Sequence, residues 1–315
     1  GMASARVELR ALADEVRRGC VRYACGGGEQ PIRLIEEASP RSRLLRQLAE
    51  VEVSLSGSQH VSQHQIQAAP PEERFRLLAS KQLDCRFRKC RRVGACLACT
   101  LRPCICPQLP PLRLGHKLWL VMHANEALRT TNSGKLLLLA HPDATLLIGG
   151  LPAHEAILRG LVRRPNAVLL YPAEEALTPA QCVAMAHRNP ARCGGTAGGG
   201  SAAAAAAAAA PERCAPLELI VVDGTWAQAK LLAKRVPPSV PRVALAAAPQ
   251  RSLFGSSLRE QSAEREAQGR VCTLEAVGML ALQMGEPPEE VESLLGYLAT
   301  FIGACEHTVR RVSRT

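Results

Sequence analysis

The chain has 315 residues, 47% of them hydrophobic, so it can bury one large core or one core with a small satellite. No stretch approaches the roughly 18 to 20 apolar residues of a membrane-spanning helix, and we expect no membrane partner. The net charge of +11 favours a polyanionic partner such as a nucleic acid. The low aromatic content, 3%, argues against the broad base-stacking surfaces of single-strand-binding proteins.

Residues 1–82 are expected to form a helical extension that carries no chemical motif. Apolar residues recur at helical spacing in Ala5–Arg18 and again in Arg41–Val53. Arginines on helices of this kind usually belong to a solvated face.

The cysteines are unevenly spread. Six of the thirteen lie between Cys85 and Cys106, and the other seven are scattered singly. An odd total in a chain of this length, without a signal peptide, argues against a secreted disulfide scaffold. We therefore expect the reducing cytoplasm, with the nucleus or an organelle left open, and a metal ion bound by the clustered cysteines.

Residues 83–113 are expected to form a small, basic, zinc-binding module. Structural zinc takes four soft ligands in a tetrahedron. The block offers two close pairs of cysteines, Cys96 with Cys99 and Cys104 with Cys106. Cys85 and Cys90 are alternatives for one member of this quartet. Seven Lys or Arg against one acidic residue also make the block a candidate holder of phosphate backbone.

From residue 114 to residue 315, apolar runs alternate with amphipathic stretches, which predicts an α/β domain with a parallel sheet and helices on both faces. The expected strands are Lys117–Met122, Ala144–Ile148, Ala167–Leu170, Leu217–Val222 and Arg242–Leu245. The expected helices are Lys135–Ala140, Ala153–Val162, Thr178–His187, Ala227–Arg235, a helix beginning at Thr273, and Pro287–Ile302. Residues 193–213, rich in glycine and with nine consecutive alanines, are a low-complexity insertion expected to form a surface loop or linker.

The most informative stretch is the fourth expected strand and the residues after it. Asp223-Gly224 interrupts the apolar run with turn chemistry, and Thr225 precedes Gln228 at the spacing of a capping box. Asp223, Gly224 and Trp226 thus lie where a buried strand leads into a helix, the position at which open α/β sheets bind ligands. An unpaired carboxylate is costly to bury there. An ordinary Asp-Gly turn with Trp226 in the core fits the spacing equally well.

Five short motifs, in order across about residues 96–302, resemble the signature of the DTW-domain family. They are Cys104-Ile105-Cys106-Pro107, Thr131-Asn132-Ser133-Gly134, Leu170-Tyr171-Pro172, Asp223-Gly224-Thr225-Trp226 and Thr273-Leu274-Glu275-Ala276. Three positions depart from the family pattern: Ala124 stands where proline is common, Ser133 replaces a threonine, and Cys272 stands where serine is usual. The four residues between the two cysteine pairs are also fewer than the family usually shows.

The resemblance implies a tRNA-uridine aminocarboxypropyltransferase, which moves the 3-amino-3-carboxypropyl group of S-adenosylmethionine onto N3 of a uridine in tRNA. It also implies a SPOUT-like core with a C-terminal trefoil knot. Asp223 would accept the N3 proton or orient the base, and Trp226 would stack on the base or wall the pocket. The implied cofactor contacts are Thr131, Asn132, Ser133, Leu170, Tyr171, Asp223, Gly224, Thr225, Arg259 and Thr273.

Two other functions stay open at this point. One is methyl transfer from the same cofactor by a SPOUT-type enzyme, and the other is RNA binding by a zinc-stapled protein without activity. The chain has no Gly-x-Gly-x-x-Gly after a strand and no P-loop, so a conventional dinucleotide-binding or P-loop enzyme is not supported.

Overall fold

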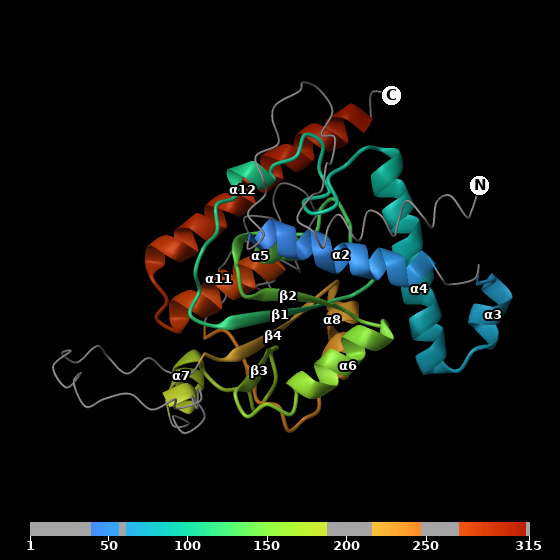
Figure 1. The fold of residues 1–315 in the computed structure, drawn as a ribbon. Coiled ribbons are helices and arrows are strands. Elements are labelled where there is room, and N and C mark those ends of the chain that lie inside the picture. Colours follow the sequence, from blue (N-terminus) through green and yellow to red (C-terminus); the bar gives the residue numbers. More distant parts are fainter. Residues whose placement is uncertain (1–38, 57–60, 188–215, 247–270, 313–315) are drawn as a thin grey trace, which may run out of the picture.

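The computed structural model describes residues 39–56, 61–187, 216–246 and 271–312 (Figure 1). Its centre is a five-stranded, entirely parallel sheet with the strand order β2-β1-β4-β3-β5. The strands are β1 (Lys117–Met122), β2 (Ala144–Ile148), β3 (Ala167–Leu170), β4 (Glu218–Asp223) and β5 (Arg242–Val243). The predicted α/β class with a parallel sheet is therefore confirmed.

The strand register brings the ends of the central strands to one edge. Met122, the last residue of β1, pairs with Asp223, the last residue of β4. On the other side of β4, Leu170 at the end of β3 pairs with Val221. Segments that follow these three strands therefore begin close together, which is the arrangement that creates ligand sites in open parallel sheets.

Helices cover both faces of the sheet, as predicted (Figure 1). One face carries α2 (Pro40–Ser56), α5 (Gly134–Ala140), α7 (Pro179–His187), α11 (Thr273–Gln283) and α12 (Pro288–Val312). The other carries α6 (Pro152–Leu161) and α8 (Trp226–Ala233). Successive residues of β4 serve the two faces in turn: Leu219 and Val221 pack into the first core cluster, and Ile220 packs into the second. A strand buried on both faces is apolar on both, which explains the apolar run Leu219–Val222 in the middle of β4.

A helix of 22 residues, α4 (Pro71–Arg92), packs against the edge at which the strands end. The ring of Phe75 meets that of His123 just after β1, and the Arg86 guanidinium donates to the Asn125 carbonyl. The helix begins with proline at its first turn, acidic residues follow in that turn, and its last turn is basic, all of which stabilise a helix. It is preceded by the short α3 (Gln63–Ala68).

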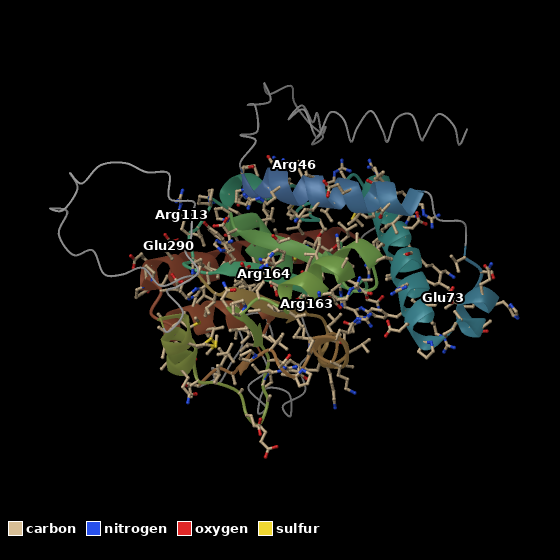
Figure 2. The ribbon with its side chains drawn as sticks, turned by 60° about the horizontal axis from the view of Figure 1, so that its bottom comes forward. Arg46, Glu73, Arg113, Arg163, Arg164 and Glu290 are labelled. Carbon is tan, nitrogen blue, oxygen red and sulfur yellow. The ribbon has the colours of Figure 1, made fainter. Side chains whose placement is uncertain are left out.

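Helix α4 crosses the boundary predicted at residue 83, and its buried residues share one core cluster with α2 and the sheet. The predicted helix Arg41–Val53 corresponds to α2. At the opposite end of the module, the Arg113 amide donates to the Glu290 carboxylate of α12, and the two residues lie near each other (Figure 2). The division into an extension, a module and a catalytic domain stays a prediction.

Three expectations fall on other parts of the chain. The helix predicted at 5–18 and the insertion 193–213 lie outside the described residues. The trefoil knot stays a prediction as well, because residues 247–270 also lie outside them. Within the described ranges, no helix combines the length and apolarity needed to cross a bilayer.

Candidate functional site

Four cysteines form a compact cluster at the end of α4. The sulfur atoms of Cys96, Cys99, Cys104 and Cys106 all lie within 4.8 Å of one another. The separations are 3.9 Å between Cys96 and Cys106 and 3.8 Å between Cys99 and Cys104. Four sulfurs around a tetrahedral zinc ion at about 2.3 Å would lie about 3.8 Å apart. The donor set and its spacing therefore fit a metal ion without rearrangement.

Cys85 and Cys90 do not belong to this cluster. Both lie on α4, where the Cys85 side chain is exposed and the Cys90 sulfhydryl is directed to the Leu128 carbonyl at 3.9 Å. The helix carries these two cysteines apart from the loop that holds the other four. The alternative in which one of them replaces a member of the quartet is therefore wrong.

The thiols of the cluster influence one another strongly. Hydrogen bonding with Cys104 lowers the pKa of Cys96 below that of an ordinary thiol. Hydrogen bonding with the same neighbour raises the pKa of Cys106. Because metal ligation requires thiolates, binding of a metal ion at the cluster would release the protons that the cysteines carry.

The second feature is a junction built around the carboxylate of Asp223, which is 3% exposed. One of its oxygens accepts a hydrogen bond from the Asn132 amide at 2.5 Å, and the other accepts one from the Thr273 hydroxyl at 2.5 Å. The three residues come from the end of β4, the loop before α5 and the first residue of α11. We call this set of three residues the Asp223 junction.

The local structure explains why these segments meet. Asn132 also accepts from the Lys135 amide at 3.0 Å, so one side chain both holds the start of α5 and reaches Asp223. Gly134 lets the loop approach, because a Cβ atom there would lie 2.9 Å from the Asp223 carboxyl carbon. The third segment is fixed by Glu275, whose carboxylate accepts from the Cys272 amide at 2.8 Å.

The turn after β4 presents Trp226 to solvent. The predicted capping box is present: the Thr225 hydroxyl accepts from the Gln228 amide, and the Gln228 side chain accepts from the Thr225 amide. Gly224 is required for this geometry, since a Cβ there would lie 2.8 Å from Gln228 Cβ. Trp226, the first residue of α8, is 45% exposed, so it is not the core residue that the alternative interpretation of this turn assumed.

The other predicted cofactor contacts are less closely grouped. Ser133 is buried beside Cys272, and Thr131 is half-buried in the same loop. Leu170 ends β3 inside the first core cluster, whereas Tyr171 packs against the second. Arg259 lies outside the described residues. The structure thus brings Asn132, Asp223 and Thr273 into direct contact.

Comparison with protein-family models supplies the identity of the fold. The model of the DTW domain matches residues 93–306, about two thirds of the chain. The chain belongs to the DTW-domain family. The matched region of this DTW-domain protein includes the cysteine quartet and the whole Asp223 junction. The family is associated with enzymes that modify tRNA. No curated protein and no solved structure matches the chain.

Sequence reasoning missed two residues that connect the quartet to the junction in this DTW-domain protein. Lys135 is 5% exposed and Thr100 is 3% exposed, and the Lys135 ammonium donates to the Thr100 hydroxyl. The sequence does contain one signal for Lys135, which is followed by four leucines and an alanine. A charged side chain in such an apolar helix needs hydrogen-bond partners, because an unpaired buried charge is costly.

Proposed function

We propose that the protein transfers the 3-amino-3-carboxypropyl group of S-adenosylmethionine to N3 of a uridine in tRNA. The observation that carries the proposal is the Asp223 junction, in which three separate family motifs meet on one carboxylate at the carboxyl end of a central strand. Ligand sites of parallel α/β sheets lie at this edge.

Asp223 is proposed to position the reacting groups. The Asp223 carboxylate accepts one hydrogen bond on each oxygen, from Asn132 and from Thr273. A carboxylate held in this way is suited to orient the N3–H group of a uridine, and its negative charge suits a sulfonium cation. With 3% exposure, Asp223 is better suited to orient the base than to exchange protons freely with water.

S-adenosylmethionine would supply an electrophilic carbon next to its sulfonium. The bond from N3 to this carbon would form as the carbon–sulfur bond breaks, methylthioadenosine would leave, and the N3 proton would pass to the Asp223 carboxylate. The proposed contacts are those named from the sequence: Thr131, Asn132, Ser133, Leu170, Tyr171, Asp223, Gly224, Thr225, Arg259 and Thr273. Zinc is the proposed metal at the quartet, since four thiolates leave no open coordination position and suit a structural zinc site.

The test is nucleoside mass spectrometry of tRNA after incubation with the full-length protein and S-adenosylmethionine. The label is placed either in the methyl group or in the carboxypropyl portion of the cofactor. We expect a modified uridine that carries the carboxypropyl label only. Incorporation of the methyl label would identify a methyltransferase instead, and unmodified tRNA would favour a protein that only binds RNA.

Trp226 is proposed to stack on a base of the RNA. Stacking on an exposed aromatic ring contributes about 1–3 kcal/mol per base, so Trp226→Ala is expected to raise the KM for tRNA by about 5- to 150-fold. Thermal stability should change little, because the ring is 45% exposed. Leu231→Ala on the same helix is the matched control, with a side chain 42% exposed and an expected KM equal to that of the wild type. Equal KM values for the two variants would remove Trp226 from the RNA site.

Helix α4 is proposed to hold the RNA backbone. Its last turns expose Arg88, Lys89 and Arg92, and Arg102 of the cysteine module is exposed as well. The bond from Arg86 to the turn after β1 places this basic surface at the same edge of the sheet as the Asp223 junction. A polyanion bound there would run from the module toward the site.

The basic surface leads to a prediction about salt. Loss of one phosphate contact reduces the slope of log affinity against log salt by about 1. We expect this change for Arg92→Ala in tRNA binding measured between low and physiological salt. Arg163→Ala is the control, because Arg163 is exposed just before β3, at the opposite edge of the sheet (Figure 2). A slope that responds equally to both substitutions would place the RNA elsewhere.

A further inference from the structure

Lys135 is a charged group in a segment that otherwise contains only buried apolar residues and one glycine. All seven residues of α5 are buried. The Lys135 ammonium donates to the Thr100 hydroxyl, to the Arg129 carbonyl at 2.9 Å and to the Thr130 carbonyl at 2.9 Å. A lysine has three donors, so these partners satisfy all of them. The ammonium also lies 4.9 Å from the centre of the Phe301 ring, a favourable position for a cation.

The partners of Lys135 belong to two different parts of the chain. Thr100 immediately follows Cys99 in the cysteine module, whereas Arg129 and Thr130 lie in the loop before α5. Thr100 has a φ of 61°, which a β-branched residue rarely adopts. It is held there by its amide, which donates to the Cys96 carbonyl at 2.7 Å, and by its hydroxyl, which donates to the Cys99 carbonyl at 2.7 Å. The cysteine loop therefore sets the position of the Thr100 oxygen.

The other side of Lys135 leads to the Asp223 junction. Its backbone amide donates to the Asn132 side chain at 3.0 Å, and that side chain donates to Asp223 at 2.5 Å. The backbone N–H of Asn132 donates to the Arg129 carbonyl, which also accepts a hydrogen bond from the Lys135 ammonium. Lys135 thus contacts the cysteine module through its ammonium group. It contacts the loop that leads to the Asp223 junction through the same ammonium group and through its backbone amide.

Apolar side chains of one core cluster and several buried polar groups meet where the two parts are in contact. A cavity of about 20 Å³ lies between α2, the cysteine module and the loop. Thr100, Glu126, Asn132 and Lys135 are the polar residues among those that line it. Hydrogen bonds between such buried polar groups add directional contacts to the apolar packing, and they therefore help to define the relative position of the two parts.

The charges around Lys135 match a metal-loaded cluster. Four thiolates around a divalent ion carry a net charge of about −2. Arg41 of α2 forms a hydrogen bond with Cys96, and Lys135 lies on the far side of Thr100. Burial lowers the pKa of Lys135 to about 8, so the side chain still carries its charge at neutral pH.

We propose that Lys135 is a positioning residue that couples metal binding at the cysteine quartet to cofactor binding at the Asp223 junction. The metal fixes the Cys96–Cys99 loop, this loop fixes Thr100, and Lys135 transmits that position to the loop that carries Asn132. Metal binding thereby raises the affinity for the cofactor. The inference rests on the proposed function for the identity of the cofactor only.

The experiment measures the dissociation constant of S-adenosylmethionine by calorimetry for the full-length protein, metal-loaded and after chelation. Coupling between two sites in a protein is typically 5- to 150-fold. For the wild type we expect chelation to weaken binding by about tenfold or more. For Lys135→Met we expect one metal ion per chain, weak binding in both states and less than about a threefold effect of chelation. Lys81→Met, an exposed lysine of α4, should behave as the wild type does.

Hydrogen exchange provides a second readout that does not need the cofactor. The amides of Asn132 and Lys135 are bonded within the junction loop and should lose protection when the metal is removed from the wild type. In Lys135→Met they should exchange fast with or without metal. Helix α6, on the other face of the sheet, is the internal reference and should keep its protection.

The outcomes separate the two proposals. Metal-dependent exchange in a protein that does not bind S-adenosylmethionine would overturn the proposed function and support the coupling. If neither cofactor affinity nor amide exchange in the junction loop changes when the metal is removed, the coupling is overturned and the proposed function is not. The coupling is also overturned if α6 loses as much protection as the junction loop. If Lys135→Met does not fold, Thr100→Val decides: it removes the acceptor of Lys135 on the module side, together with the hydroxyl bond to the Cys99 carbonyl, and should also reduce the effect of chelation.

Discussion

The Asp223→Asn variant is expected to transfer the carboxypropyl group at least about 100-fold more slowly than the wild type. Asp223 accepts hydrogen bonds from an amide and from a hydroxyl, one on each oxygen. An asparagine keeps only one acceptor oxygen, so the Thr273 hydroxyl would have to turn and accept from the new amide if the bond from Asn132 is kept. Each hydrogen bond to a charged group contributes about 1.5–3 kcal/mol, so these bonds would be weakened and the negative charge would be lost. The measurement is the single-turnover rate on tRNA.

The control for this variant is Asp143→Asn. Asp143 is exposed in the turn before β2, at the opposite edge of the sheet, and its variant should retain the wild-type rate. Asparagine has nearly the size of aspartate, so we expect the affinity of Asp223→Asn for S-adenosylmethionine to fall less than its rate. A folded Asp223→Asn protein with more than half of the wild-type rate would show that the carboxylate takes no part in transfer.

Removal of the metal is expected to have the largest effect on stability. Cys99 is completely buried, and Cys99→Ser should abolish metal binding and lower the free energy of unfolding by at least about 3 kcal/mol. For a domain of this size that corresponds to a fall in Tm of about 6–12 °C. Metal content by mass spectrometry and Tm by calorimetry are the measurements.

Cys85→Ser is the matched control for the metal variant, because the same chemical change is made at an exposed cysteine of α4. It should keep one metal ion per chain and the wild-type Tm. The chelated wild type should unfold near the Tm of Cys99→Ser, since both lack the metal. Loss of metal from Cys85→Ser would contradict the quartet that the structure defines.

Most strands could be predicted because their chemistry is local. β1, β2 and β3 have the predicted bounds, since each is a short apolar run between polar turns. Only Arg242–Val243 of the predicted Arg242–Leu245 forms β5. The order of the strands could not be predicted from the sequence. β4 lies between β1 and β3, and this order depends on contacts between residues far apart in the chain.

Helix α4 was missed for a physical reason. It is highly charged, and it buries only a narrow stripe consisting of Ala79, Leu83, Phe87 and Cys90. The cysteine spacing indicates metal ligation, but Leu83, Phe87 and Cys90 also follow the spacing of one helix face, which indicates a helix. Proline at the first turn, followed by Glu72 and Glu73, could have revealed where the helix begins.

The candidate site was predictable as a set of motifs but not as a geometry. The turn residues after β4, the capping box of α8 and the first residue of α11 all follow from short-range patterns. The contact of Asn132 and Thr273 with one carboxylate depends on how three segments pack. Lys135 could not be assigned either, because its partners are carbonyls and a hydroxyl, and no spacing rule reveals backbone acceptors.

The parallel sheet places the Asp223 junction and the start of β4 at opposite edges. β4 begins at the edge opposite the Asp223 junction, where the Asn166 side chain donates to the Pro216 carbonyl. The described chain resumes at Pro216, on the side of the sheet away from the Asp223 junction. An affinity tag inserted just before Pro216 is therefore expected to leave the geometry of the junction unchanged.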